Sequence, residues 1–335
     1  MTAGPLLPNV LAFAVPLILS GMLQLLYNSA DIIVVGRFAD SVAMASVGAT
    51  TSLIHLLVSL LMGLSVGASV AVARSAGAGD RDGVHRAVHT SMALAVLSGA
   101  ALGVLLLVLS RPLLEMMGCP ADVVGGAQLY LNIYAVGLPA SLVYNYGAAI
   151  LRAVGDTKRP LYYLTVSGLV NVVLNVALVA GLRLGVAGVA IATVVSETIS
   201  AALVLVSLIA SHGDVRFEPK KTRIERRSLS MILRIGIPYG LENSMFQLGK
   251  IVVLSLVSGF VTISITANAV ANIVSTFAIL AGTSMGYALS AVTAQCVGAR
   301  DYGQVRYYTR KLMLFSYIGL WVMNLLIFAL LPVIT

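Results

Sequence analysis

The stretch that decides the fold is Gln24-Leu25-Leu26-Tyr27-Asn28-Ser29-Ala30-Asp31-Ile32-Ile33-Val34-Val35, late in an apolar run that begins near Val10. A helix through it places Gln24, Asn28 and Asp31 on one stripe, because they are spaced i, i+4 and i+7. Pro16, two turns before Gln24, removes a backbone hydrogen bond and bends that helix. A carboxylate at mid-membrane costs about 2.5–3.5 kcal/mol on insertion scales. Asp31 is therefore either a functional acid that faces a cavity or a structural acid that ties helices together by hydrogen bonds.

The composition is that of a membrane protein with many spans. The 335 residues are 59% hydrophobic and 10% charged, and the mean hydropathy is +0.97. Long apolar runs recur from end to end, so we predict an all-α polytopic membrane protein. Cys119 and Cys296 do not have the spacing of a metal site or a disulfide framework, and we interpret both as packing residues. His85 and His89, spaced i and i+4, lack an evident third ligand and are interpreted in the same way.

The apolar runs predict nine helices, most of them longer than the ~20 residues that a span needs. Their predicted ranges are Val10–Val35, Ala45–Arg74, Val88–Leu109, Val123–Val154, Leu161–Leu182, Val186–Ala210, Met231–Val257, Ser264–Val297 and Tyr307–Ile334. We expect residues 1–212 to form a first lobe of six helices and residues 213–229 to form a cytoplasmic linker. Residues 230–335 then hold three helices of a second, partial lobe.

Basic residues gather on one side of these helices. Seventeen of the 21 lie between helices 2 and 3, 4 and 5, 6 and 7, or 8 and 9, whereas Arg37, Arg111 and Arg183 lie on the other side. The positive-inside rule makes the seventeen-residue side cytoplasmic, together with the N-terminus. We therefore expect a multi-pass protein of the inner (plasma) membrane whose basic loops attract anionic lipids, and no nucleic-acid partner. Residues 1–5 carry no basic segment, so the first helix is expected to be retained.

Two segments recur along the chain. Ala14-Val15-Pro16 corresponds to Gly236-Ile237-Pro238 with an offset of 222 residues. Gly77–Val84 corresponds to Gly298–Val305 with an offset of 221 residues. Six helices separate the copies, so the repeat is parallel, as in two-lobed transporters. A complete second lobe would need helices 10 to 12, and we expect a fragment or a truncated product that lacks about 100 residues, unless another chain completes it. The glycine-rich copies are interpreted as helix ends and turns, because they lack the context of a phosphate-binding loop.

With this layout the chain resembles the multidrug and toxic-compound extrusion (MATE) transporter family. The segments Leu151–Pro160, Asn171–Asn175 and Gly185–Val194 carry the resemblance further. It covers the first nine of the family's twelve helices. The resemblance implies a central cavity between two six-helix lobes, a monomer at full length, no cofactor and no enzymatic activity. It also implies export of small organic compounds, often cationic, in exchange for H⁺ or Na⁺.

The resemblance assigns cation coupling to Asp31, which would take up a proton or bind Na⁺. It places Asn171 of helix 5 and Thr193 of helix 6 near this acid. Asn175 stands where many members carry a second acid. Its carboxamide oxygen can still ligate a hard cation, although one negative charge is lost. With Asp31 as the one clear acid of the first lobe, H⁺ is favoured over Na⁺, and no metal site beyond Na⁺ at Asp31 is expected.

Further polar residues are candidates for the substrate cavity. Gln24, Asn28 and Asn145 either line it or cross-link helices. Glu197 in helix 6 is either a cation-binding acid or a hydrogen-bonded structural acid, and the structural role is favoured.

Helix 7 carries a second polar stripe. Asn243, Gln247 and Lys250 are spaced i, i+4 and i+7, and Pro238 provides a second helix bend. Lys250 stands at the repeat position of Asn28. A contact of Glu242 with Lys250 would let two charges share a buried site, and we assign both residues to the substrate cavity.

These observations predict a secondary active antiporter that exports organic, cationic or amphipathic compounds. A lipid-linked oligosaccharide flippase of the same superfamily remains an alternative, although its substrate would favour basic residues in the cavity rather than at the cytoplasmic rim. An intramembrane enzyme such as a prenyltransferase is the alternative from another class. It would need paired acidic motifs that hold Mg²⁺ at a helix mouth, and the sequence contains no such pair.

Overall fold

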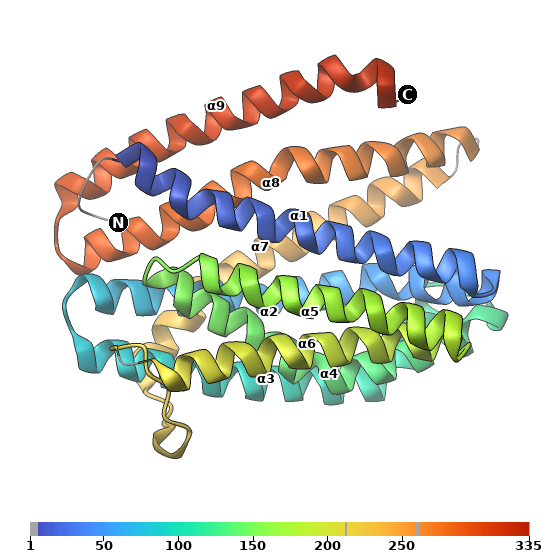
Figure 1. The fold of residues 1–335 in the computed structure, drawn as a ribbon, viewed down its shortest axis with the longest axis horizontal. Coiled ribbons are helices and arrows are strands. Elements are labelled where there is room, and N and C mark those ends of the chain that lie inside the picture. The colour runs from blue at the N-terminus through green and yellow to red at the C-terminus, as the bar shows by residue number, and fades with distance from the viewer. Residues whose placement is uncertain (1–5, 212, 259–261, 335) are drawn as a thin grey trace.

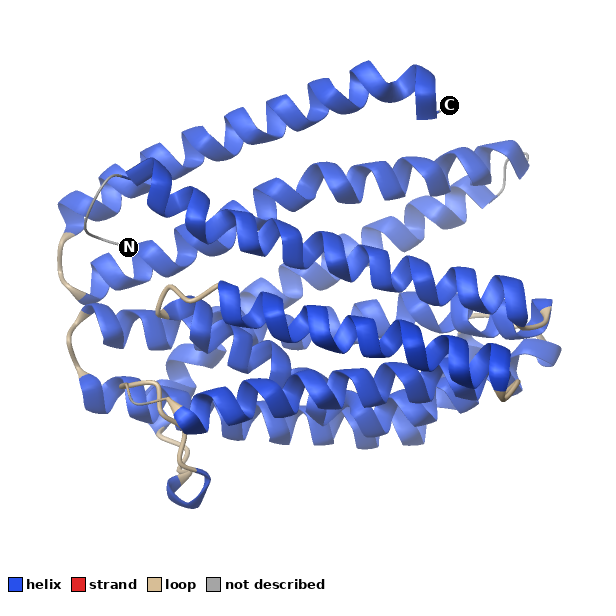
Figure 2. Cartoon of the chain, viewed as in Figure 1, coloured by secondary structure: helices blue, strands red, loops and turns tan. Residues whose placement is uncertain are grey.

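The computed structural model describes residues 6–211, 213–258 and 262–334. These residues form helices joined by short connections, with no strand among them (Figure 2). The long helices are α1 (Leu6–Phe38), α2 (Ser41–Gly77), α3 (Arg81–Met116), α4 (Ala121–Ala153), α5 (Lys158–Asn175), α6 (Gly185–Ala210), α7 (Arg226–Ser258), α8 (Thr262–Gly298) and α9 (Tyr302–Ile334). The prediction of an all-α architecture is confirmed. Residues 1–5, on which the expectation that the first helix is retained depends, lie outside the described residues.

Most helices begin one or two turns before the apolar run that predicts them. Capping explains two of these starts. The side chain of Asp40 accepts a hydrogen bond from the backbone N–H of Ala43 at 2.8 Å, and Asp80 does the same for Gly83 at 2.8 Å. Such N-caps satisfy donors that the first turn leaves free. Hydropathy therefore places the starts of α2 and α3 too late, at Ala45 and Val88.

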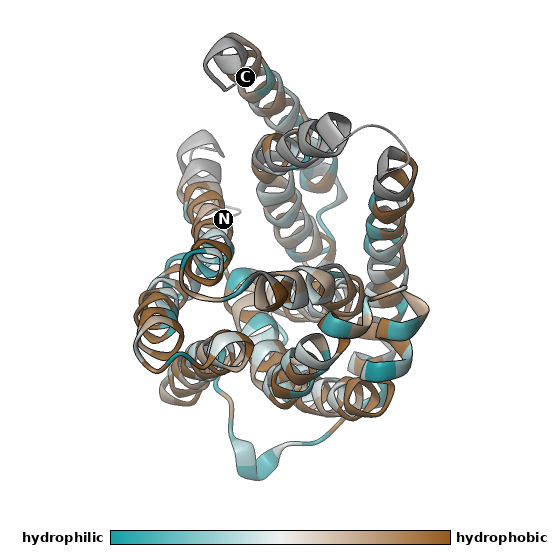
Figure 3. Cartoon of the chain, turned by 90° about the vertical axis from the view of Figure 1, so that its right-hand side faces the viewer, coloured by the Kyte–Doolittle hydropathy of each residue, from teal (hydrophilic) through white to brown (hydrophobic). Residues whose placement is uncertain are grey.

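The predicted helix Leu161–Leu182 is not a single α-helix. The α-helical part α5 ends at Asn175, and a π-helix, η1 (Val176–Gly181), continues from it. A π-turn widens the backbone and is found often at functional sites. The linker between α6 and α7 contains one short 3₁₀ helix, η2 (Pro219–Lys221). Figure 3 shows this linker as a hydrophilic loop that projects from the bundle.

Among the described residues, seven helical segments are long and apolar enough to cross a membrane. They are Ala12–Phe38, Val42–Gly77, Arg81–Met116, Ala121–Ala153, Lys158–Gly181, Gly185–Ala210 and Tyr302–Ala329. The chain therefore has the fold of a multi-pass membrane protein. α7 and α8 run beside these helices but are not among the seven segments.

The helices lie side by side, with α9 at one edge of the view and α3 and α4 at the other (Figure 1). α4 is the most buried span, because α2, α3 and α6 all pack against it. α1 is far less buried and lies against α5 and α8. The start of α1 and the α2–α3, α4–α5, α6–α7 and α8–α9 connections lie at the same end of the molecule, which we call the basic end.

α2 and α7 pack with their backbones in direct contact. A methyl group added to Gly63 of α2 would lie 2.3 Å from the backbone nitrogen of Gly240. One added to Gly236 of α7 would lie 2.7 Å from the Cα of Leu64. Small residues permit this close approach of helices in membranes, where it replaces hydrophobic driving force. These glycines fix α7 against the first six helices.

The two copies of the repeat have the same turn geometry. Asp301 caps α9 through the backbone N–H of Gln304 at 3.0 Å, as Asp80 caps α3 through Gly83, again with an offset of 221. The copies also touch reciprocally. A Cβ on Gly77 would meet the carbonyl oxygen of Gln295 at 2.0 Å, and a Cβ on Gly298 would meet that of Arg74 at 2.0 Å. Since 74 and 77 correspond to 295 and 298, a local two-fold axis passes between α2 and α8 at the basic end.

Candidate functional site

A cavity of about 130 Å³ lies between α1, α4, α5 and α6. It brings together Asp31 with Asn171 and Thr193, and also Gln24, Asn28 and Asn145 from the predicted substrate set. Fifteen residues line it: Gln24, Tyr27, Asn28, Asp31, Ser141, Tyr144, Asn145, Leu164, Ser167, Gly168, Asn171, Thr193, Ser196, Glu197 and Ser200. Most of these side chains are polar, which is costly inside a membrane unless they serve each other or a ligand.

Asp31 is held by a chain of carboxamides. The amide of Asn175 donates to the Oδ1 atom of Asp31 at 2.5 Å and lies 3.1 Å from the Oδ1 atom of Asn171. Asn171 in turn donates to the hydroxyl of Ser196 at 3.4 Å. Asn171 and Asn175 are one helical turn apart, so a single face of α5 serves the acid on α1. No described Lys or Arg forms an ion pair with Asp31.

Two buried oxygens in this region have no hydrogen-bond partner among the described residues. They are the Oδ1 atom of Asn175 and the Oε2 atom of Glu197. An unsatisfied buried polar atom costs about 1–3 kcal/mol, more if charged. Carboxylate, carboxamide and hydroxyl oxygens are the donors that a hard cation prefers. The donor set around Asp31 therefore fits a small monovalent cation or a proton.

Glu197 is a second acid that lines the cavity. From the sequence it is either a cation-binding acid or a hydrogen-bonded structural acid. Thr193, Glu197 and Ser200 are spaced i, i+4 and i+7 on α6, the same spacing as the polar stripe on α1. The spacing of these three residues could have placed Glu197 in the cavity from the sequence alone. Because two acids line the cavity, the number of acids does not favour H⁺ over Na⁺.

The walls of the cavity hold α1 against α5. The ring of Tyr27 lies over Gly168, where an added Cβ would stand 1.9 Å from it, and its hydroxyl donates to the carbonyl of Thr165 at 3.4 Å. The amide of Asn145 donates to the carbonyl of Ser141 at 2.9 Å, within its own helix. Its carboxamide oxygen is left available to the cavity.

The polar residues of α7 lie elsewhere. Glu242 and Asn243 line a separate open cavity of about 750 Å³, together with Pro238 and Phe246. The Nζ atom of Lys250 stands 5.1 Å from the centre of the Phe246 ring. Among the described residues no direct ion pair joins Lys250 to Glu242. Neither residue lines the cavity around Asp31.

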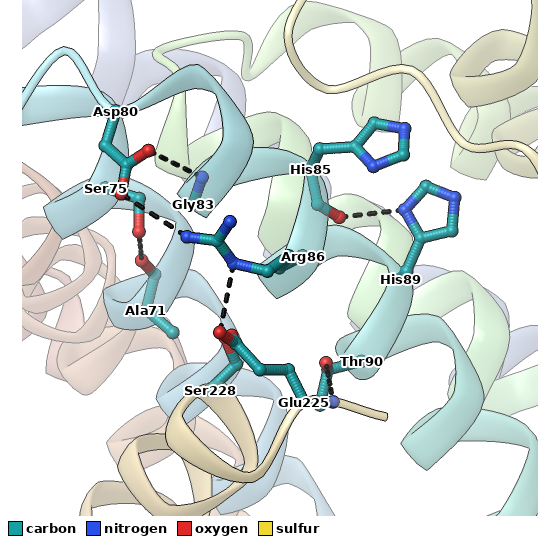
Figure 4. A network of polar contacts seen from close by, with 10 residues as sticks. All are labelled: Ala71, Ser75, Asp80, Gly83, His85, Arg86, His89, Thr90, Glu225 and Ser228. Carbon is teal, nitrogen blue, oxygen red and sulfur yellow. Dashed lines mark hydrogen bonds and ion pairs between the residues drawn. The ribbon is translucent and has the colours of Figure 1, made fainter. Parts of the chain in front are cut away.

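The histidine pair serves packing at the basic end (Figure 4). The Nδ1 atom of His89 lies 2.8 Å from the carbonyl oxygen of His85, and its Nε2 atom accepts from the backbone N–H of Glu218 at 3.0 Å. The Nε2 atom also lies 3.2 Å from the carbonyl oxygen of Glu218, so both ring nitrogens of His89 lie against the backbone. No group of three potential ligands that could hold a metal ion occurs in the described part of the chain.

The helices and the position of this cavity define an all-α polytopic transporter fold. Residues 16–177 and 238–335 match the MatE family, and the chain belongs to that family. The two matches begin at the prolines that open the repeat, 222 residues apart. The resemblance read from the sequence is thereby confirmed.

Relatives and solved structures agree with this assignment. The chain is 28% identical over 316 residues to the "Probable multidrug resistance protein YoeA" of Bacillus subtilis (strain 168). This match covers 92% of this chain and 67% of that protein. It is 25% identical over 260 residues to the "Probable multidrug resistance protein YpnP" of the same organism, with 77% and 58% covered. The solved "Outward-facing conformation of a multidrug resistance MATE family transporter of the MOP superfamily" has a similar fold, with a TM-score of 0.89, 24% identity, and 97% and 72% covered.

Proposed function

We propose that the protein is a secondary active antiporter that exports small organic, cationic or amphipathic compounds in exchange for H⁺ or Na⁺. One observation carries the proposal. Asp31 and Glu197 line one small cavity among carboxamides and hydroxyls, and no basic residue is among its lining residues. Such a cavity concentrates negative charge where only a cation or a proton can compensate it. The printed names of the relatives, as multidrug resistance proteins, agree with a substrate of this class.

The cavity has a place for either ion. A proton would neutralise Asp31 and change what its oxygens accept from Asn175. A sodium ion would use the carboxylate of Asp31 with the free oxygens of Asn175 and Glu197, and with the hydroxyl of Thr193. Gln24, Asn28 and Asn145 extend the polar surface from this site and are assigned to the substrate. Glu242 and Lys250 remain assigned to substrate contacts outside it, on α7.

Coupling follows if the cation and the substrate favour different arrangements of the helices. A ligand shifts a conformational equilibrium only by its difference in affinity for the two states. α1 carries the acid and the bend at Pro16, and it is little buried, so its position responds to the charge at Asp31 more readily than that of α4. The basic end faces the cytoplasm in this proposal, and the protein resides in the inner membrane.

The test is dye efflux driven by a proton or a sodium gradient in membrane vesicles. The variants are Asp31→Asn, which keeps the shape and removes the charge, and Glu115→Gln, which removes an exposed acid of α3 that does not line the cavity. We expect Asp31→Asn to lose at least tenfold in gradient-driven efflux and Glu115→Gln to retain it. Equal efflux by Asp31→Asn and the unmodified protein would remove the site from the mechanism.

A further inference from the structure

A second cavity, of about 240 Å³, lies at the basic end where α2, α3, α7 and the α8–α9 turn meet. Four arginines and two acids line it: Arg74, Arg86, Arg227, Arg300, Asp80 and Glu225. The four guanidinium groups exceed the two carboxylates, so the cavity has an excess of positive charge. Its residues come from segments far apart in the sequence, and they converge where the repeat turns touch.

The two acids are engaged with a single arginine. The Nε atom of Arg86 stands 3.0 Å from a carboxylate oxygen of Glu225, and its Nη2 atom stands 3.6 Å from one of Asp80 (Figure 4). The other oxygen of Glu225 accepts from the hydroxyl of Ser228. Glu225 is further fixed because its backbone N–H donates to the hydroxyl of Thr90 at 3.1 Å. Arg86 and its two acids together carry one net negative charge, so the four arginines and two acids of the lining sum to a net charge of +2.

The other three arginines have no such compensation. Arg74, Arg227 and Arg300 form no ion pair with any carboxylate that the structure describes. All three are exposed, so water screens the repulsion among them, and an anion held between them would add direct attraction. Guanidinium groups bind phosphate and carboxylate through paired hydrogen bonds, and they do so better than lysine because the donors form a planar fork.

Arg300 keeps its place at a conformational cost. Its φ is +59°, the left-handed region, where its repeat counterpart Gly79 has a φ of +67°. A residue with a Cβ costs about 1–2 kcal/mol there, whereas glycine does not. The α2–α3 turn has the residue that the backbone favours, and the α8–α9 turn has an arginine that lines the cavity. This difference singles out the guanidinium group of Arg300.

We propose that this cavity binds a small phosphate-type oxyanion, either free inorganic phosphate or the phosphate of an anionic lipid headgroup. With a volume of about 240 Å³ the cavity has room for a phosphate group. The anion would join Arg74 of α2 with Arg227 of α7 and Arg300 of the α8–α9 turn. It would thus stabilise the arrangement seen here, in which these residues line one cavity.

The test measures binding of inorganic phosphate by calorimetry to the full chain in nanodiscs of phosphatidylcholine, at constant ionic strength. The variants are Arg300→Gly, which suits the left-handed backbone of its turn and removes the guanidinium group, and Arg227→Gln. Arg306→Gln removes one charge from an exposed arginine of α9 that does not line the cavity, and it is the control. We expect the Kd for phosphate to rise at least tenfold in the two cavity variants and to stay within twofold in the control.

A parallel series adds phosphatidylglycerol to the nanodiscs and distinguishes the two sources of phosphate. A weaker apparent affinity for phosphate in these nanodiscs, absent in Arg300→Gly, identifies the lipid headgroup as a competitor for the same site. An unchanged affinity assigns the site to the soluble anion. Equal phosphate affinity in Arg300→Gly, Arg227→Gln and Arg306→Gln, or no phosphate binding in phosphatidylcholine, overturns the proposal.

Discussion

α1 and α7 occupy corresponding places in the repeat, but they differ in how they contact the neighbouring helix and in the residue at the position of Asp31. α1 is joined to α5 by side chains, through Asp31 with Asn175 and through the ring of Tyr27. α7 is joined to α2 by backbone contacts at glycines. With the offset of 222, Val253 stands where α1 has Asp31, and it is exposed. The first copy of the repeat therefore carries a partly buried acid, which we propose as the cation site, and the second copy has an exposed apolar residue at that position.

Replacement of Asn175 tests the side-chain contact that joins α1 to α5, and it has the largest expected effect. Asn175→Leu leaves Asp31 without its donor, and a hydrogen bond to a charged group contributes about 1.5–3 kcal/mol. We expect the affinity for the coupling cation to change by about 10-fold to 100-fold, since each 1.4 kcal/mol is tenfold. Titration of transport rate against pH and sodium concentration measures it. Unchanged titration curves would show that Asn175 does not act on the acid.

Asn243→Leu on α7 is the matched control for that variant. Its amide donates to the carbonyl of Tyr239 at 3.1 Å, within its own helix, and it is not part of the Asp31 cavity. We expect the cation titration to be unchanged. A shift as large as that of Asn175→Leu would make the two helices equivalent and would contradict the comparison.

Gly63→Ala tests the fixed helix. The added methyl group meets the backbone of Gly240 at 2.3 Å, which no side-chain rotation can relieve. Overpacking of this kind costs about 1–3 kcal/mol, and we expect a lower melting temperature in detergent. Gly249→Ala, on α7, is the control because a Cβ there has no neighbour within 4 Å. Equal melting temperatures of the two variants would show that the backbone contact is not needed.

Lys250→Met has the smallest expected effect. The ammonium group of Lys250 lies over the Phe246 ring and has no ion pair among the described residues, and such a cation–π contact contributes about 0.5–1 kcal/mol. We expect a stability change below about 1 kcal/mol and unaltered cation dependence. A changed dependence of transport on H⁺ or Na⁺ concentration in this variant, with normal folding, would assign coupling to α7 as well.

Much of the fold was predictable, because a membrane imposes long apolar helices and the repeat fixes their relative direction. The membrane fold, the family and the turn geometry at residues 77–84 and 298–305 follow from these patterns. Helix starts were predicted late, since caps such as Asp80 lie outside the apolar runs. The π-helix Val176–Gly181 was missed because hydropathy does not distinguish π-turns from α-turns.

The candidate site was predictable only in part. The stripe on α1 and the pair Asn171 and Asn175 could be named, but their meeting across α1 and α5 depends on tertiary packing that one sequence does not contain. Glu197 was undervalued, although its helix repeats the spacing seen on α1. Lys250 was placed with Glu242 by spacing, whereas the aromatic ring one turn away is its partner in the structure.

Counter-transport of dye in proteoliposomes measures whether Asp31 couples a cation to substrate movement. H⁺ and Na⁺ fluxes are followed by fluorescent indicators while dye moves down its own gradient. We expect the unmodified protein to move H⁺ or Na⁺ against the dye, and Asp31→Asn to move dye without a cation flux. A cation flux of normal size per dye molecule in Asp31→Asn would contradict this expectation.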